Sequence, residues 1–466
     1  GERMLRILIG IAVVVALIIV AALQWPEEST PDFVEIGRLE VDGNAEIVRA
    51  SADGRLLVYT NAKRNSIDIV DLSEPSAPAV VGSVGVPGQP TSVDLSQDGL
   101  WALATVHANR SKKGKPPGDP RLPGVLAVID LRQPAAPELA AIIGIDNHPD
   151  SVAVTTAGDN LVAVIAVENE PVFVNNDVVV DADQMDDATD ISQAGVVQIV
   201  SLDPEAPRNW SVTTLEIPPE LLTQAEMLYP DDPQPEFVAL SPGRHMAAIS
   251  LQENNGILLV DLAAAEISGA FSLGFVANRP ADLKNDGVAA LNQYYPADSQ
   301  AVELAGARIP DGIAFSPDGQ YLLSADEGEA PMTGGRGISI WALNGDLAWN
   351  DNGEIELQAV QAGFYPDDRS EEKGIEIEGI SAGRFGMRDF AFAVSERGSF
   401  MVIYDISNPN APELLQLLPT GEGPEGIVAI PAINLIVVAA EESGTLTVYR
   451  YEPSTESNDL VTDLIN

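Results

Sequence analysis

The chain repeats one arrangement of acidic residues, in which a carboxylate stands directly before a short apolar segment. Six of seven copies of this segment begin in this way, with Glu46, Asp150, Glu236, Asp311, Glu378 and Glu425. A second set stands at or just after the next apolar segment and comprises Glu168, Glu253, Glu327, Glu396, Glu441 and Glu442. Carboxylates that gather in space repel one another unless cations, water or arginines offset their charge. Ca²⁺, which takes six to eight oxygen ligands, suits such a cluster.

A calcium site is therefore one interpretation of these residues. Its ligands are expected among Glu253, Asp311, Glu327 and Glu425, and Asn254 and Asn255 could add neutral oxygens. No EF-hand loop is present, so the hypothesis depends on residues that are distant in sequence. The alternative is a solvated acidic funnel without a bound ion, because the chain has a net charge of −45. Neither interpretation requires a cofactor.

Three short strands, which recur seven times, must position these residues. The first strands are expected at 46–51, 92–96, 150–155, 236–241, 311–316, 378–383 and 425–430. The second strands are expected at 56–60, 101–106, 161–167, 246–251, 321–325, 390–394 and 435–440. The third strands are expected at 66–72, 125–131, 196–202, 257–262, 338–343, 400–406 and 445–450. Weaker fourth strands, such as 79–84 and 413–418, complete four-stranded meanders, so the sequence predicts an all-β, seven-bladed β-propeller.

The two ends of the repeat predict how the ring closes. Residues 33–41 form a strand without a blade of their own, whereas the seventh copy lacks a fourth strand. Pairing the two would hide an open sheet edge. The propeller is therefore predicted to span 33–453, followed by a tail at 454–466; the alternative is an open solenoid. In such a meander the start of the first strand and the end of the second share one face, so both carboxylate sets should ring one channel mouth.

An apolar segment near the N-terminus predicts a membrane anchor. Residues 4–25 can span the lipid bilayer, and Arg3 and Arg6 precede the apolar run. Residues 1–25 are thus predicted to be a cytoplasmic stub and single-pass transmembrane helix, and 26–32 a linker, with the propeller on the periplasmic or extracellular side of the cell membrane. The alternative is a cleaved signal peptide, although the run is long and lacks a clear A-x-A site. The acidic mouth is expected to face away from the membrane.

The overall composition excludes several classes of function. A strongly acidic chain has no general attraction to nucleic acid, and its charge is typical of proteins from salt-loving organisms. With no cysteine, the chain has no disulfides and no haem attachment motif, and it lacks a phosphate-binding P-loop and a G-x-S-x-G motif. A histidine-based centre could form only between His107 and His148. No motif in the sequence therefore indicates nucleophilic catalysis or redox chemistry.

Several segments resemble the choice-of-anchor I β-propeller family. The resemblance is carried by QPEFVALS, LQENNGILLVDL, IPDGIAFSPDGQYLLSADEGEA, SERGSFMVIYDISNPNAP, GPEGI and AEESGTLTVY. That family includes surface glycoprotein-like proteins and some described as alkaline phosphatases, and its architecture loosely resembles that of calcium-dependent propeller phytases. The resemblance marks as site residues Glu253, Asn254, Asn255, Asp311, Glu327, Glu396, Arg397, Glu425 and Glu442. This chain has Pro331 where the family tends to have an arginine, which puts a phosphatase role in doubt.

The leading functional hypothesis is a membrane-anchored binding or scaffold protein. It could be an accessory subunit of an integral membrane complex, with insertions at 107–124, 169–195 and 276–307 as contact surfaces for a membrane-protein partner. The alternative is a Ca²⁺-dependent phosphoesterase at the acidic mouth. In that case Arg308, Arg336 or Arg397 would contact phosphate. The sequence favours a binding protein over an enzyme.

Overall fold

The computed structural model describes residues 32–107, 123–169, 172–175, 178–180, 188–294, 306–328 and 335–453. The chain divides into two units. The smaller unit consists of Gly1–Val34 and Tyr451–Asn466. Within it, the backbone N–H of Glu452 donates to the carbonyl of Asp32 (2.7 Å). The larger unit, Glu35–Arg450, contains the β-sheets described below.

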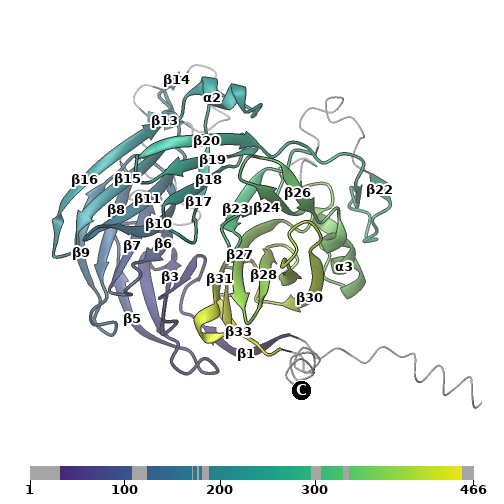
Figure 1. The fold of residues 1–466 in the computed structure, drawn as a ribbon, viewed down its shortest axis with the longest axis horizontal. Helices are drawn as coiled ribbons and strands as arrows, with labels where there is room; N and C mark the ends of the chain where they lie inside the picture. Colours follow the sequence, from purple (N-terminus) through teal and green to yellow (C-terminus); the bar gives the residue numbers. More distant parts are fainter. Residues whose placement is uncertain are drawn as a thin grey trace, which may run out of the picture. The chain divides into compact units, whose positions relative to one another are not determined.

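Seven four-stranded sheets, here called blades 1 to 7, make up the larger unit (Figure 1). Blade 1 comprises β2 (Val48–Ala50), β3 (Leu56–Asn61), β4 (Ser66–Asp71) and β5 (Ala79–Gly85). Blade 2 comprises β6 (Gln89–Leu95), β7 (Trp101–His107), β8 (Val125–Asp130) and β9 (Glu138–Gly144). Blade 3 comprises β10 (Pro149–Ala157), β11 (Asn160–Val167), β15 (Val196–Asp203) and β16 (Ala206–Glu216). All of these strand pairs are antiparallel.

The second half of the chain repeats the pattern. Blade 4 comprises β17 (Pro235–Leu240), β18 (Met246–Leu251), β19 (Gly256–Asp261) and β20 (Glu266–Ser272). Blade 5 comprises β23 (Pro310–Phe315), β24 (Tyr321–Asp326), β25 (Gly337–Ala342) and β26 (Leu347–Asn350). Blade 6 comprises β27 (Ile377–Phe385), β28 (Arg388–Ser395), β29 (Phe400–Asp405) and β30 (Glu413–Pro419). Blade 7 joins β31 (Pro424–Ile430), β32 (Leu435–Ala440) and β33 (Thr445–Tyr451) to β1 (Phe33–Glu40).

The first strands of the seven blades form the inner wall of a closed ring. Each first strand contacts the first strand of the next blade, in the order β2, β6, β10, β17, β23, β27, β31 and back to β2. Figure 1 shows these strands toward the centre of the ring. Apolar side chains fill the space between blades; for example, Leu103 of blade 2 and Ile165 of blade 3 belong to one buried cluster. The predicted seven-bladed, all-β architecture is confirmed.

The closing blade takes strands from both ends of the propeller. Strand β1 lies beside β33, as the unpaired strand at 33–41 predicts. After β1 the chain stays beside the same strand, because the N–H of Val41 donates to the carbonyl of Gly444 (2.9 Å). The fourth position of blade 7 is therefore filled by the segment that precedes blade 1, and the described blades form a closed ring instead of an open solenoid.

Several elements lie outside the repeat and were not predicted. A small sheet consists of β12 (Phe173–Asn175), β13 (Val178–Val180) and β14 (Thr189–Asp190), and a second one of β21 (Pro280–Ala281) and β22 (Gln293–Tyr294). Helix α2 (Pro219–Gln224) follows blade 3, helix α3 (Glu354–Ala362) follows blade 5, and two short 3-10 helices lie at Asp367–Arg369 (η3) and Pro431–Ile433 (η4). Among the described residues, no helix has the length and hydropathy needed to cross a bilayer. The predicted anchor at 4–25 lies outside these residues, as do most of the 107–124 insertion and the tail at 454–466.

Candidate functional site

The six carboxylates that begin first strands line one cavity of the propeller. This cavity has a volume of about 240 Å³, and its wall contains Glu46, Asp150, Glu236, Asp311, Glu378 and Glu425. Each comes from a different blade. Blade 2 contributes Gln89 and Thr91 to the same wall in place of a carboxylate. The cavity is here called the acidic mouth.

A β-bulge places five of these six residues on the wall; Glu46 of blade 1 is the exception. In blades 2 to 7 the antiparallel pairing of the first and second strands shifts register near the start of the first strand. In blade 3, for example, Pro149 pairs with Val167 and Ser151 with Ala166, so Asp150 lies in the bulge between them. A bulged residue re-aims its side chain relative to the ladder. The equivalent bulged residue of blade 2 is Thr91, between Pro90 and Ser92.

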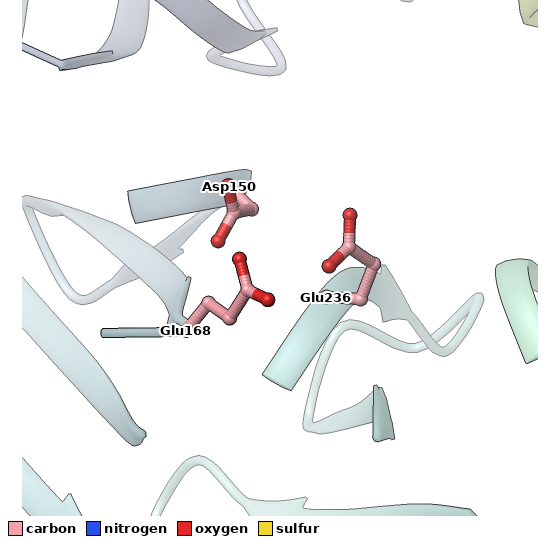
Figure 2. Close-up of side chains that lie close together, drawn as sticks. All are labelled: Asp150, Glu168 and Glu236. Carbon is pink, nitrogen blue, oxygen red and sulfur yellow. The ribbon is translucent and has the colours of Figure 1, made fainter. Parts of the chain in front are cut away.

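Three groups of carboxylates bridge neighbouring blades. In each group, one ligand oxygen per residue lies within 4.8 Å of the others; the groups are Asp150, Glu168 and Glu236; Asp311, Glu327 and Glu378; and Glu378, Glu396 and Glu425. Each group combines a first-strand carboxylate, the residue after the second strand of the same blade, and the first-strand carboxylate of the next blade. Figure 2 shows the carboxylates of Asp150, Glu168 and Glu236 pointing toward one another.

Burial and mutual repulsion favour the protonated forms of these carboxyls. Burial raises the pKa of Glu236 well above its ordinary value, and the charges of Asp150 and Glu168 raise it further. Burial likewise raises the pKa of Glu378, with added repulsion from Glu327 and Glu425. Burial also raises the pKa values of Asp311 and Glu425 well above their ordinary range. A cation in the acidic mouth would relieve this repulsion.

Basic side chains offset part of this charge on one side of the acidic mouth. The Lys373 ammonium contacts the carboxylate of Glu327 and lies 3.5 Å from that of Glu376. The Arg397 guanidinium lies 3.0 Å from the Glu396 carboxylate and also contacts Glu376. These pairs lie beside blade 6, while Asp150, Glu168 and Glu236 gather at the junction of blades 3 and 4.

In blade 4 the residue that directly follows the second strand is Gln252, and the predicted Glu253 comes next. Strand β18 ends at Leu251, so the position equivalent to Glu168 in blade 3 is Gln252. The Gln252 amide donates a hydrogen bond to the Glu327 carboxylate (2.5 Å). Glu253 is exposed on the following turn and belongs to none of the three carboxylate groups among the described residues.

The side-chain amides of the two predicted amide ligands, Asn254 and Asn255, form hydrogen bonds within the protein. Asn254 is fully buried, and its amide donates to the carbonyl groups of Leu228 (2.9 Å) and Tyr229 (3.0 Å). Asn255 is also buried; its amide donates to the Gly274 carbonyl (2.7 Å), and its oxygen accepts from the N–H of Ile309 (3.1 Å). Both side chains therefore fasten loops and do not offer oxygens to the acidic mouth.

In blade 2 the last residue of the second strand, His107, occupies the position equivalent to Glu168 of blade 3. The His107 Nε2 lies 3.6 Å from the Asp150 carboxylate and 3.1 Å from the Pro149 carbonyl. Its ring stacks on His148, with centroids 5.1 Å apart. The two histidines thus lie side by side at the junction of blades 2 and 3. Because the equivalent position is acidic in blades 3, 5, 6 and 7, the pattern of carboxylates alone did not reveal His107.

The remaining predicted residues lie at the junction of blades 7 and 1. The Glu441 carboxylate accepts from the Asn44 amide (3.0 Å), and both Glu46 and Glu441 raise the pKa of the buried Glu425. Glu442 is exposed, and its carboxylate is 3.4 Å from the Arg397 guanidinium. Glu46 and Glu441 therefore lie near Glu425 at the junction of blades 7 and 1.

Two of the three arginines that were considered as phosphate ligands are structural. Arg336 is fully buried and donates to the carbonyl groups of Asp282 (2.7 Å) and Ser370 (2.7 Å). Arg308 is 5% exposed, lies 3.6 Å from the Asp326 carboxylate and packs over the Trp341 ring. Only Arg397 of the three lies beside the carboxylates of the acidic mouth and is partly exposed, at 36% of its side chain.

The comparisons with known proteins agree with this architecture. Residues 46–332 and 330–409 match the family model of the choice-of-anchor I domain. A chain of Kuenenia stuttgartiensis hydrazine synthase is similar in structure, with a TM-score of 0.53 and 13% identity over 88% of this chain and 97% of that chain. The Myceliophteria thermophila Cps50 (Swd1) β-propeller domain has a TM-score of 0.52 and 11% identity over 90% of this chain and 100% of that chain.

At these identities the structural likeness concerns the fold alone. No curated protein matches the sequence. The family model, in contrast, covers most of the propeller, including blades 1 to 5 in full. The chain therefore belongs to the choice-of-anchor I family.

Proposed function

We propose that this protein is a binding protein displayed at the cell surface, and that its acidic mouth binds Ca²⁺. The three carboxylate groups that bridge blades carry the proposal. Their donor atoms are all carboxylate oxygens, which hard cations prefer, and Ca²⁺ tolerates the irregular geometry that a ring of blades supplies better than Mg²⁺ does. An ion bound between two first strands would hold neighbouring blades together. It would also keep the acidic mouth in one conformation for a ligand or partner.

The proposal is tested by titrating the full chain with Ca²⁺ in an isothermal calorimeter. Glu378 belongs to two of the three groups, so Glu378→Gln should weaken Ca²⁺ binding by roughly tenfold or more, because affinity follows ligand charge. Mg²⁺ should bind more weakly than Ca²⁺.

Glu253→Gln is the matched control, since it makes the same chemical change at an exposed position outside the groups. Its Ca²⁺ affinity should equal that of the unaltered chain. Equal affinities for all three proteins, or no saturable binding at all, would show that the acidic mouth is a solvated funnel.

The place of the protein in the cell is part of the same proposal. Residues 4–25 hold the propeller at the outer side of the membrane, where it serves as a scaffold or accessory subunit for a membrane protein. Strand β1 runs toward the acidic mouth, since Asn44, which follows it, contacts Glu441. This direction supports a mouth that faces away from the membrane. Resistance of the full chain to alkaline carbonate extraction tests the anchor, and release from membranes would contradict it.

The phosphoesterase alternative has little support from the arginines. A phosphate in the acidic mouth would have to use Arg397, whose guanidinium already contacts Glu376 and Glu396. The carboxylates of Glu376, Glu396 and Glu442, each within 3.4 Å of this guanidinium, would repel a phosphate. We therefore expect no hydrolysis of a generic phosphate monoester by the full chain, with Ca²⁺ or with a chelator. Ca²⁺-dependent hydrolysis that Arg397→Gln abolishes would establish the alternative.

A further inference from the structure

The channel of the propeller contains a second cavity, whose chemistry is opposite to that of the acidic mouth. Its volume is about 300 Å³, and three charged residues line it: Arg49, Asp94 and Arg244. The rest of the wall is mainly apolar and includes Phe237 and Ile313. Ligand pockets in proteins commonly have this size and this mixture of apolar wall and few polar groups. This cavity is here called the arginine chamber.

The arginine chamber lies farther along the first strands than the acidic mouth. Arg49 follows Glu46 by three residues on the inner wall of blade 1, and Phe237 lines both cavities. Arg244 lies in the turn between β17 and β18. In a meander this turn is at the opposite end from the start of the first strand. A ligand can therefore reach the arginine chamber from the opposite face, without passing the carboxylates of the mouth.

Both guanidiniums keep most of their hydrogen-bond donors for the arginine chamber. Among the described residues, Arg49 donates only to the Val48 carbonyl (2.9 Å) and Arg244 only to the Val154 carbonyl (2.6 Å). A guanidinium carries five N–H donors. Neither has a carboxylate within ion-pair distance in the part of the chain that the structure describes. The Arg49 guanidinium also packs over the Phe237 ring, 5.6 Å from its centroid, which holds it across the channel.

The charges of the arginine chamber do not balance. Asp94 accepts from the N–H groups of Leu95 (2.8 Å) and Val154 (2.7 Å), so its carboxylate is fastened to the backbone of two blades. Burial raises the pKa of Asp94, and Arg49 and Arg244 partly offset this, so both guanidiniums lie near the same carboxylate. Burial also lowers the pKa of Arg49. The wall therefore carries two positive guanidiniums and one carboxylate. One further negative charge, from a bound ligand, would make the chamber neutral.

We propose that the arginine chamber binds a small organic carboxylic acid. Its carboxylate takes the free donors of Arg49 and Arg244, and its apolar body packs against Phe237 and Ile313. Bidentate contact with a carboxylate suits the planar guanidinium better than contact with a spherical ion. The site is separate from the acidic mouth and does not depend on Ca²⁺.

The test is a calorimetric titration of the full chain with acetate, hexanoate and benzoate. Hexanoate or benzoate should bind saturably and more tightly than acetate, because the apolar wall adds burial. Benzamide, which has nearly the same shape as benzoate but no charge, should not bind. Arg49→Gln and Arg244→Gln should each weaken binding by roughly tenfold or more.

Arg384→Gln is the matched control, because Arg384 is exposed, pairs with Asp389 (2.6 Å) next to the turn between β27 and β28, and does not line the arginine chamber. This variant should bind the acids as the unaltered chain does. Arg49→Lys keeps the charge and should retain part of the affinity, and thermal unfolding shows whether each variant is folded. Absence of saturable binding by all three acids, equal binding of benzamide, or unchanged affinity in both glutamine variants would overturn the proposal. Binding that survives in Glu378→Gln but is lost in Arg49→Gln would separate this site from the acidic mouth.

Discussion

The bulged residue of the first strand in blades 2 to 7 determines which side chain faces the acidic mouth. Thr91 and five carboxylates occupy this position in blades 2 to 7, so a change of one side chain alters the acidic mouth directly. The sequence predicted these carboxylates because each stands just before an apolar strand. It did not identify Gln252 of blade 4, which directly follows the last paired residue of β18. The pairing of Pro235 with Leu251 shows that Leu251 is the last paired residue of β18. The sequence of one strand does not reveal which residues of the neighbouring strand it pairs with.

The raised pKa values of these carboxyls predict how stability depends on pH. Glu236, Glu378 and Glu425 hold their protons to a higher pH in the folded chain than in the unfolded chain. The free energy of unfolding should therefore fall as pH rises from about 5 to about 8, because the folded state then loses protons that the unfolded state has already lost. Thermal unfolding in a chelator, measured across this range, checks the slope.

Glu378→Gln isolates the contribution of the acidic mouth to that slope. The variant should lose less stability with rising pH than the unaltered chain, and Ca²⁺ should flatten the profile of the unaltered chain. Asp351, whose pKa burial raises to about 7, contributes equally to both proteins. A melting temperature that rises with pH, or equal slopes for both proteins, would contradict the prediction.

Close approach of neighbouring first strands depends on glycine next to the carboxylate. A Cβ added to Gly379 would lie 2.0 Å from the carbonyl oxygen of Glu425, and one added to Gly426 would lie 2.2 Å from that of Glu46. In blade 3 a serine takes this place, and its hydroxyl accepts from the N–H of Val238 in blade 4 (3.1 Å). Adjacent blades are thus joined by backbone contact or by side-chain hydrogen bonds at the level of the acidic mouth.

Gly379→Ala should therefore damage both stability and the acidic mouth. The added methyl must displace the backbone at Glu425, which should lower the free energy of unfolding by about 1–3 kcal/mol or more. Chemical denaturation measures this loss, and Ca²⁺ titration should show weaker binding, because the carboxylates of Glu378 and Glu425 move apart. Gly85→Ala is the control, since a Cβ there meets nothing within 4 Å. Equal stability of the two variants would refute the role of the glycine.

The elements outside the repeat could not be predicted from the pattern of strands. Helix α3 is short, and its position depends on buried charge pairs: Glu356 lies 3.3 Å from Arg279 and 3.5 Å from Arg336. Arg336 also donates to carbonyl groups that come from distant loops. The sequence suggested that Arg336 and Arg308 could meet phosphate, because an arginine near an acidic cluster can serve either purpose. Burial decides between the two, and burial is a property of the folded chain.

The net charge of −45 affects the stability of the whole molecule. The number of blades and the closure by β1 were both predicted, because seven copies with one spare strand leave few other arrangements. The net charge, in contrast, does not indicate the order of the strands. It affects how the stability of the folded chain depends on the solvent. Repulsion among so many carboxylates is long-range in dilute buffer and is screened within a few ångströms in concentrated salt.

Salt should therefore stabilise the propeller. Raising NaCl from about 0.1 M to about 2 M should increase the melting temperature, because screening weakens the repulsion that the folded state concentrates. Calorimetric or fluorescence unfolding measures the shift, and a non-ionic solute of matched osmolality serves as the control. The same salt effect with that solute would indicate exclusion from the surface instead of charge screening, and no shift would contradict the prediction.

Blade 7 also determines when the protein can finish folding. Its sheet joins β1 to β31, β32 and β33, so a strand that precedes blade 1 in the chain must wait for three strands that follow blade 6. During synthesis, six sheets can assemble from consecutive strands, while β1 is available to pair elsewhere. The seventh sheet can therefore form only after β33 has been synthesised, and a chain that stops before β33 has an open ring with unpaired strand edges.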